Sequence, residues 1–147
     1  EEGAAAVISV DASPAYAATA RSEAQRRGYA ERATYFEGDF VDLADKVPAA
    51  DFVTMDRVLC CYHDMPGLLG PAAERAKICL GLVFPRESWW IRGGARAANL
   101  LMRLFGSKFQ AFVHPHEAVE ACAAESGLAL RSSEFSGIWR VVVFVRR

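Results

Sequence analysis

The sequence has no long apolar run and no cluster of basic residues, and each absence excludes a class of protein. The longest apolar stretches, such as residues 80–85 and 141–145, are far shorter than the ~20 residues that a helix needs to cross a bilayer. We therefore expect no membrane span. Lysine and arginine number 17 against 18 acidic residues, which leaves a formal net charge of −1. Without a basic stripe, we expect no nucleic-acid partner.

Cysteine is also scarce and never has the spacing of a metal site. The four cysteines, at positions 60, 61, 79 and 122, include no C-x-x-C pair, and the adjacent Cys60 and Cys61 make a poor disulfide. We therefore expect buried free thiols in a reducing cytoplasm. His114 and His116 flank Pro115, but no acid or cysteine stands at ligand spacing beside them, so we expect no metal there.

What is present is an ordinary globular composition, 52% hydrophobic and 24% charged, in a length that suits one compact domain over residues 1–147. Short apolar runs alternate with helical patterns, which indicates a wound α/β fold. Strands are expected at residues 5–10, 33–37, 50–56 and 80–84, and helices at residues 15–27, 66–79, 89–105 and 116–126.

The first strand and helix carry the clearest local signals. Residues 5–10 form a continuous apolar run that ends at Asp11, which is typical of a strand buried in a parallel sheet. Ser13 supplies a capping hydroxyl and Pro14 suits the first helical position. Gly28 then ends the helix. The sequence therefore predicts a strand-turn-helix unit with an acid at the strand tip.

The chain ends in a different pattern. Two further strands, at residues 128–135 and 138–145, are separated by Ser136 and Gly137, which predicts an antiparallel pair. Nucleotide-binding dehydrogenase folds end with another parallel strand, whereas class I methyltransferases end with a reversed hairpin. The hairpin therefore favours the second class.

The sequence resembles class I S-adenosylmethionine-dependent methyltransferases at five places along nearly its whole length. The matching segments are residues 7–13, 38–40, 51–58 and 80–86 and the terminal hairpin. Residues 57–64, 84–86 and 112–115 also resemble the magnesium-protoporphyrin O-methyltransferases. The resemblance implies a Rossmann-like wound sheet, mostly parallel with an antiparallel C-terminal hairpin, and S-adenosyl-L-methionine as cofactor.

The chain departs from the family's pattern at its start. The family's first strand and Gly-x-Gly-x-Gly loop should lie roughly 20 residues before the acid that binds ribose, but only ten residues precede Asp11 and they contain one glycine, Gly3. Residues 1–6 resemble the end of the family's first helix. We therefore expect a partial domain that lacks the first strand, whose place would be between the strands starting at Ala5 and Ala50.

The resemblance assigns cofactor contacts to the tips of two strands. Asp11, with Ala12 beside it, matches the acid that accepts the ribose hydroxyls. Asp39 follows Gly38 and matches the acid that meets the adenine amino group, while the amide and ring of Phe40 meet the base. The alternatives are structural: Asp11 as a cap of the first helix, and Asp39 as a turn residue beside a core phenylalanine.

Two further pairs follow the strand at residues 50–56. Asp56 and Arg57 match the position beside the sulfonium and amino-acid end of the cofactor, or else form a local ion pair. Tyr62 and His63 lie in the next loop, where His63 could act as a general base that deprotonates the nucleophile near neutral pH. The alternative for His63 is a surface histidine that caps the following helix.

Arginines and tryptophans gather after the strand at residues 80–84. Arg86, Arg92 and Arg96 lie near Trp89 and Trp90, a combination that suits a planar substrate bearing a carboxylate. Arginines on an amphipathic helix are more often a solvated face, and that reading stays open.

The leading hypothesis is methyl transfer from S-adenosyl-L-methionine to a small-molecule acceptor, with this chain inactive alone. A Rossmann enzyme that uses NAD or a nucleotide sugar would also place Asp11 on ribose, but the antiparallel ending and the lack of a Tyr-x-x-x-Lys pair argue against it. A non-catalytic module with the same fold is the third possibility. Neither the methyl acceptor nor the oligomeric state follows from the sequence.

Overall fold

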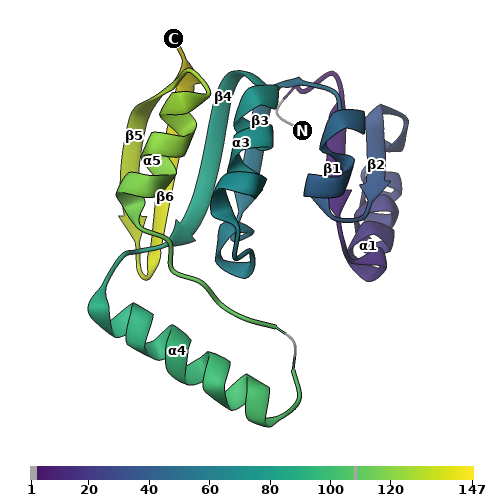
Figure 1. The fold of residues 1–147 in the computed structure, drawn as a ribbon. Helices are drawn as coiled ribbons and strands as arrows, with labels where there is room; N and C mark the ends of the chain where they lie inside the picture. The colour runs from purple at the N-terminus through teal and green to yellow at the C-terminus, as the bar shows by residue number, and fades with distance from the viewer. Residues whose placement is uncertain (1–2, 108) are drawn as a thin grey trace. The chain divides into compact units, whose positions relative to one another are not determined.

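The computed structural model describes residues 3–107 and 109–147, in which strands and helices alternate along the chain (Figure 1). The chain divides into two compact units, Glu1–Pro48 and Ala49–Arg147, which we call unit 1 and unit 2. Each unit holds one sheet, with strand order β1-β2 in unit 1 and β3-β4-β6-β5 in unit 2. The expected α/β fold, mostly parallel with an antiparallel C-terminal hairpin, is confirmed.

Unit 1 is a small parallel layer. β1 (Val7–Asp11) and β2 (Ala33–Glu37) run parallel, with Asp11 opposite Glu37. The helix between them, α1 (Pro14–Arg26), begins as predicted, because Ser13 Oγ accepts the N–H of Tyr16. The remaining elements are short: η1 (Ala30–Arg32), α2 (Phe40–Leu43) and η2 (Ala44–Lys46).

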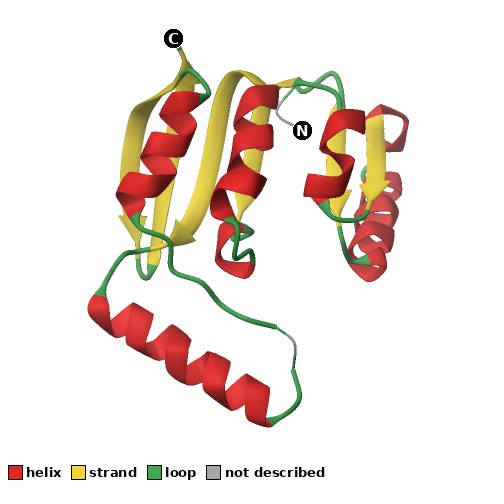
Figure 2. Ribbon diagram, viewed as in Figure 1, coloured by secondary structure: helices red, strands yellow, loops and turns green. Residues whose placement is uncertain are grey.

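Unit 2 holds a four-stranded mixed sheet with two helices on one face (Figure 2). Its elements in chain order are β3 (Ala50–Asp56), η3 (Leu59–Cys61), α3 (Met65–Arg75), β4 (Ala76–Pro85), α4 (Trp89–Leu104), α5 (His116–Glu125), β5 (Leu128–Ser136) and β6 (Trp139–Arg146). β3 and β4 are parallel, and β6 runs antiparallel to both β4 and β5.

The core of unit 2 lies between this sheet and helices α3 and α5. Leu80, Leu82 and Phe84 alternate along β4 and are at most 1% exposed, and Val142 and Phe144 of β6 are equally buried. The helices contribute Leu68, Leu69, Ala72, Val119 and Ala123. The alternation shows that one face of the sheet is packed by helices, as a two-layer architecture requires.

Helix α4 stands apart from this layered body, joined to it by a segment at each end (Figure 1). None of its sixteen residues is buried. Across the described part of the chain, no helix is both long and apolar enough to span a bilayer.

The main error in the predicted elements falls at Ala76. We predicted a helix over residues 66–79, but α3 ends at Arg75 and β4 begins at Ala76. A short apolar stretch fits both helical and strand periodicity, so the pattern alone could not separate them. In the structure, a contact from β6 lies at the point where the helix ends. The guanidinium of Arg146 donates to the carbonyl oxygens of Ala73 at 2.8 Å and Ala76 at 3.1 Å. This contact from β6 satisfies carbonyls at the helix end.

The start of the chain also differs from expectation. The strand begins at Val7 rather than Ala5, and it is not buried, since Val7 is 44% exposed. The reason is that β1 has a single partner strand, β2, among the described residues. In the other sheet, β3 likewise pairs only with β4. The expected helix end falls partly on residues 1–2, outside the described residues, and residues 3–6 form no helix.

Candidate functional site

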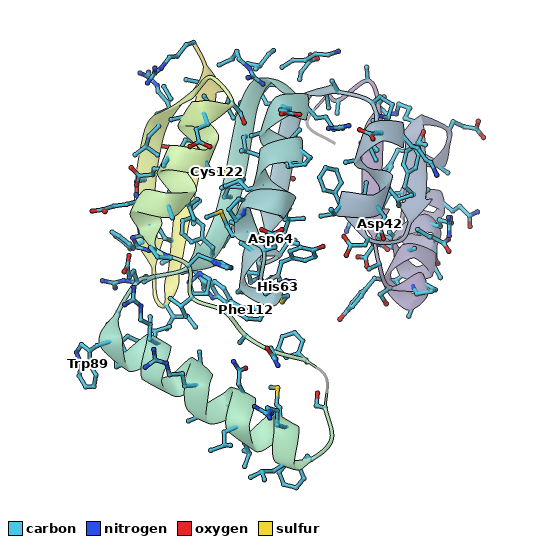
Figure 3. All side chains as sticks on the ribbon, viewed as in Figure 1. Asp42, His63, Asp64, Trp89, Phe112 and Cys122 are labelled. Atoms are coloured by element: carbon cyan, nitrogen blue, oxygen red, sulfur yellow. The ribbon has the colours of Figure 1, made fainter. Side chains whose placement is uncertain are left out.

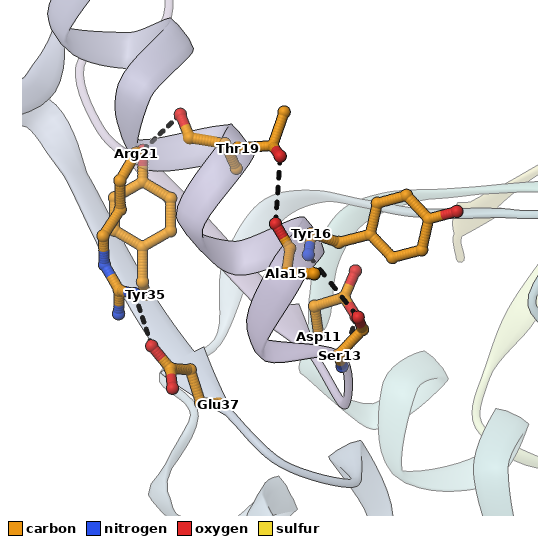
Figure 4. A network of polar contacts seen from close by, with 9 residues as sticks. Asp11, Ser13, Ala15, Tyr16, Thr19, Arg21, Tyr35 and Glu37 are labelled. Carbon is orange, nitrogen blue, oxygen red and sulfur yellow. Dashed lines mark hydrogen bonds and ion pairs between the residues drawn. The ribbon is translucent and has the colours of Figure 1, made fainter.

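Asp11 ends β1 and its carboxylate shapes the turn into α1 (Figure 4). Its Oδ1 accepts the N–H of Ser13 at 2.7 Å. Its Oδ2 accepts no hydrogen bond from the residues that the structure describes. Ser13 rather than Asp11 is the N-cap of α1, so the alternative role as helix cap is wrong. Ala12 lies exposed in the same turn. The turn therefore holds one carboxylate oxygen in place and leaves the other available for a ligand.

Asp39 lies at the same edge of the unit 1 sheet as Asp11. β1 and β2 are parallel with Asp11 opposite Glu37, so both strands end together. The N–H of Gly38 donates to the carbonyl oxygen of Asp11 at 3.0 Å and ties the two ends. Gly38 has φ of 141°, which favours glycine at this turn. Asp39 Oδ1 accepts the N–H of Val41 at 2.9 Å and caps α2. The predicted pair of acids does share one sheet edge.

Phe40 is the first residue of α2 and is half-buried. Backbone N–H groups in the first turn of a helix have no intrahelical acceptor, so the amide of Phe40 is suited to a ring nitrogen of a base. Glu37 is paired with Arg21, whose guanidinium lies 5.0 Å from the ring centroid of Tyr35 (Figure 4). This pairing neutralises the third carboxylate at the strand end.

In unit 2, Asp56 and Arg57 form the local ion pair that was one of the two predicted readings. Arg57 Nε lies 3.2 Å from Asp56 Oδ1, and both side chains are more than half exposed. Arg57 has φ of 58°, among the described residues the one positive φ outside glycine. Its N–H donates to Val83 O at 2.9 Å, and its guanidinium lies 5.7 Å from the ring of Trp139. A non-glycine residue held in this conformation marks a constrained strand tip.

Tyr62 and His63 lie in the loop after β3, where Figure 3 shows His63 beside Phe112. The rings of His63 and Tyr62 stack with centroids 5.9 Å apart, and the ring of Phe112 is 6.4 Å from His63. His63 is exposed and does not cap α3; Asp64 does so by accepting the N–H of Gly67 at 3.1 Å. The imidazole thus sits on an aromatic surface, open to a ligand.

The segment at residues 111–116 completes this cluster, although the sequence suggested only a family resemblance for residues 112–115 and no contact for them. Asn99 of α4 exchanges two hydrogen bonds with the backbone of Ala111, at 2.7 and 2.8 Å. The N–H of Phe112 donates to Cys60 O at 2.8 Å. His114 Nε2 lies 2.9 Å from the carbonyl oxygens of both Leu59 and Tyr62. Apart from the resemblance at residues 112–115, the sequence signals for these contacts were a hydrogen-bonding asparagine and a histidine near apolar residues.

A pocket of about 370 Å³ opens between α4 and this segment. Its lining residues are Arg92, Ala95, Arg96, Asn99, Ala111, Phe112, Val113 and Pro115. Arg92 is paired with Glu87, whereas Arg96 makes no ion pair within the described residues. Phe112 both lines the pocket and contacts the His63 ring. The pocket therefore offers one uncompensated cation beside aromatic rings, at the size of a small organic ligand.

The other predicted groups have structural roles. His116 Nε2 accepts the N–H of Glu87 at 2.8 Å, and burial together with the nearby charge of Arg140 lowers the pKa of His116. The cysteines are free, but only Cys122 is buried, so the expectation of four buried thiols is wrong. Burial and the neighbouring Cys61 raise the pKa of Cys60 to about 12. Within residues 3–107 and 109–147, no three potential ligands group as a metal site.

No family model and no curated protein sequence matches the chain. Several solved structures, however, are similar to the chain. Magnesium protoporphyrin IX methyltransferase from Synechocystis PCC 6803 with bound SAH has a TM-score of 0.74 at 20% identity, over 97% of this chain and 64% of that one. An O-methyltransferase family protein from Burkholderia thailandensis has a TM-score of 0.74 at 16% identity, over 96% and 51%.

A third similar structure is an O-methyltransferase from neocarzinostatin biosynthesis, in complex with S-adenosylmethionine and 2-hydroxy-5-methyl naphthoic acid. Its TM-score is 0.65 at 18% identity, over 97% of this chain and 49% of that one. The chain thus spans between about half and two thirds of these neighbours. The chain has the Rossmann-like fold of class I S-adenosylmethionine-dependent methyltransferases.

Proposed function

We propose that the chain is part of an enzyme that transfers a methyl group from S-adenosyl-L-methionine to a small-molecule acceptor. One observation carries the proposal: Asp11 and Asp39 stand at the carboxyl ends of two adjacent parallel strands. In wound sheets this edge is where nucleotides and related cofactors bind. Two of the similar structures were solved with SAH or S-adenosylmethionine bound.

The residues of unit 1 fit the nucleoside part of that cofactor. The open Oδ2 of Asp11 accepts hydrogen bonds from the vicinal ribose hydroxyls, with Ala12 leaving the turn uncrowded. Asp39 accepts the adenine amino group, and the amide of Phe40 donates to the ring. Asp56 and Arg57 are assigned to the sulfonium and amino-acid end. When bound, the cofactor supplies an electrophilic methyl group on a positively charged sulfur.

The residues of unit 2 fit the acceptor. Methyl transfer is an in-line displacement, so the protein contributes mainly orientation and removal of the acceptor's proton. We assign proton removal to His63, with Tyr62 orienting the imidazole by stacking. Phe112 offers a flat contact surface, and Arg96 is suited to an anionic substituent on a planar acceptor.

Calorimetric titration of the intact protein with S-adenosylhomocysteine tests the cofactor half. Binding is expected at micromolar levels. Asp11→Asn and Asp39→Asn are each expected to weaken it by about 10-fold or more, because hydrogen bonds to charged groups contribute ~1.5–3 kcal/mol. Asparagine also caps helices, so Asp39→Asn leaves the start of α2 intact.

The matched control is Asp42→Asn, which removes an exposed carboxylate from the same short helix and should leave the affinity unchanged. Failure of the intact wild-type protein to bind would end the proposal and favour the non-catalytic module. Undiminished binding by Asp11→Asn would remove the ribose contact.

Turnover of His63→Ala tests the acceptor half. Loss of a general base should lower kcat by ~100-fold, while the affinity for S-adenosylhomocysteine stays unchanged. Cys61→Ser, an exposed change in the same loop, serves as the control. A decrease of only a few-fold would show that His63 has no role in proton transfer.

A further inference from the structure

The side chains of α4 are arranged in the opposite way to those of an ordinary surface helix. Its polar face, with Arg92, Arg96 and Asn99, turns toward the segment at residues 111–116. Most of its large apolar residues, by contrast, are exposed. The exposed apolar face consists of Trp89 (85% exposed), Trp90 (51%), Leu100 (62%), Leu101 (57%), Leu104 (74%) and Phe105 (82%).

These apolar residues fall on one side of the helix in a group at each end, with the small residues Gly93, Gly94 and Ala97 between the two groups. The six residues come from both ends of one helix, and Trp89 projects away from the body of unit 2 in Figure 3. Large apolar patches of this kind on a protein surface mark a binding face for another molecule. The chemistry of that molecule follows from the charges around the face.

The charge distribution in this part of the chain is one-sided. Residues 88–115 contain Arg92, Arg96, Arg103 and Lys108 and no acidic residue, although the chain as a whole has a net charge of −1. All 18 acidic residues thus lie outside a stretch that holds four of the 17 basic ones. A partner for this region must be apolar where it meets the helix and anionic beside it.

We propose that α4 is an interfacial helix that docks on an anionic lipid bilayer. A strongly amphipathic helix with arginines on the polar face and tryptophan, leucine and phenylalanine on the other is the pattern of helices that lie in the membrane surface. Tryptophan prefers the headgroup level. In this orientation the apolar face enters the acyl boundary, and the exposed Arg103 stays at the level of the phosphates.

A second copy of the chain is a poorer partner for the same face. Packing two α4 helices together brings two sets of cations close to one another, and the helices carry no acidic residue; Glu87, just before the helix, offsets only Arg92. An anionic bilayer supplies both the apolar layer and the opposite charge. The site at the strand ends takes no part in this docking.

The test is flotation of the 147-residue chain with vesicles of phosphatidylcholine alone and with about one third phosphatidylglycerol. Binding is expected to the anionic vesicles and to fall by about tenfold or more at high salt, since screening weakens the attraction to the headgroups. Leu101→Gln combined with Leu104→Gln should weaken binding by at least about tenfold. Arg103→Gln should weaken it by about fivefold.

Two matched controls lie on β5. Leu130→Gln changes a leucine that is 42% exposed, and Arg131→Gln removes an exposed arginine; both should bind like the wild type. All the altered side chains are exposed, so circular dichroism should show unchanged melting.

Three results would overturn the proposal. The first is absence of binding to the anionic vesicles. The second is equal loss of binding in the controls. The third is a dimer, seen by sedimentation, that dissociates in the double leucine variant without any vesicle binding by the wild type.

Discussion

Unit 1 and unit 2 contain similar elements but very different cores. Among the described residues of unit 1, the buried apolar side chains are three alanines, Ala17, Ala24 and Ala44, whereas unit 2 buries Phe84, Phe144 and many leucines. One helix on a two-stranded sheet cannot enclose large side chains, and such a small sheet is marginal by itself. The four strands and two helices of unit 2 can enclose large side chains. A local fold can therefore form correctly without providing its own stability.

The two units also differ in the chemistry they present. Unit 1 offers carboxylates held by turns, at Asp11 and Asp39. Unit 2 offers aromatic rings and cations, with His63 in the loop after β3, Phe112 beside it and Arg96 in the pocket. The first set suits a hydroxyl-rich nucleoside, and the second suits a planar acceptor. The difference between the two cores thus coincides with a proposed division of ligands.

The largest expected effect tests the core of unit 2. Phe84→Ala should lower the free energy of unfolding by about 3–5 kcal/mol, because it removes a fully buried ring. Tyr16→Ala in unit 1, where the side chain is 71% exposed, should change it by less than ~0.5 kcal/mol. Urea unfolding measures both. Similar losses for the two variants would abolish the contrast between the units.

Hydrogen exchange measures the same contrast without substitution. Amides of β1 and β2 should exchange at least ~100-fold faster than those of β4 and β6, since local opening is easiest where few apolar contacts must break. Mass spectrometry of peptic fragments gives the rates. Equal protection of the two sheets would show that unit 1 has a source of stability beyond its alanine core.

Two capping aspartates provide a finer comparison. Asp64→Ala should cost about 1 kcal/mol of global stability, because Asp64 caps the eleven-residue α3 that packs on the unit 2 core. Asp39→Ala removes the same kind of cap from the four-residue α2. We expect it to speed exchange within α2 while the urea midpoint stays nearly unchanged. A loss as large as that of Asp64→Ala would show that α2 unfolds with the rest of the chain.

The smallest effect concerns pH and His116 in unit 2. Burial and the charge of Arg140 lower its pKa in the folded state, so the unfolded chain takes up the proton first. As pH falls below ~6.5, the value for an unperturbed histidine, unfolding becomes easier until the folded pKa is reached. His116→Gln should reduce this acid-dependent loss, as followed by thermal melting at several pH values. An unchanged pH dependence would exclude His116 as its source.

Much of the fold could be predicted because the local signals agree with the final structure. Ser13 and Pro14 start α1 where expected, and the hairpin from Leu128 to Arg146 is antiparallel. The end of α3 could not be predicted, because Arg146 fixes it from a strand 70 residues away. Burial of β1 was wrong because a sequence pattern cannot show how many strands flank it.

The candidate site was predictable in part for the same reason. Asp11 is the last residue of β1 and Asp39 comes two residues after β2, so the parallel pairing brings them to one edge. Phe112 and His114 contact η3 and the residues after it, which lie about 50 positions earlier in the sequence. No periodicity in the sequence encodes contacts at such a separation. The roles of these residues emerge only from the tertiary structure.

Within the part of the chain that the structure describes, β1 and β3 are each paired along one edge only, and this has a practical consequence for work with this chain. A strand that lacks a neighbour presents backbone N–H and C=O groups as a template, and proteins usually cover or charge such borders. Val7 on β1 and Phe52 on β3 are uncharged and are 44% and 68% exposed. Concentrated samples are therefore prone to strand-to-strand aggregation, and dilute handling is advisable in every measurement above.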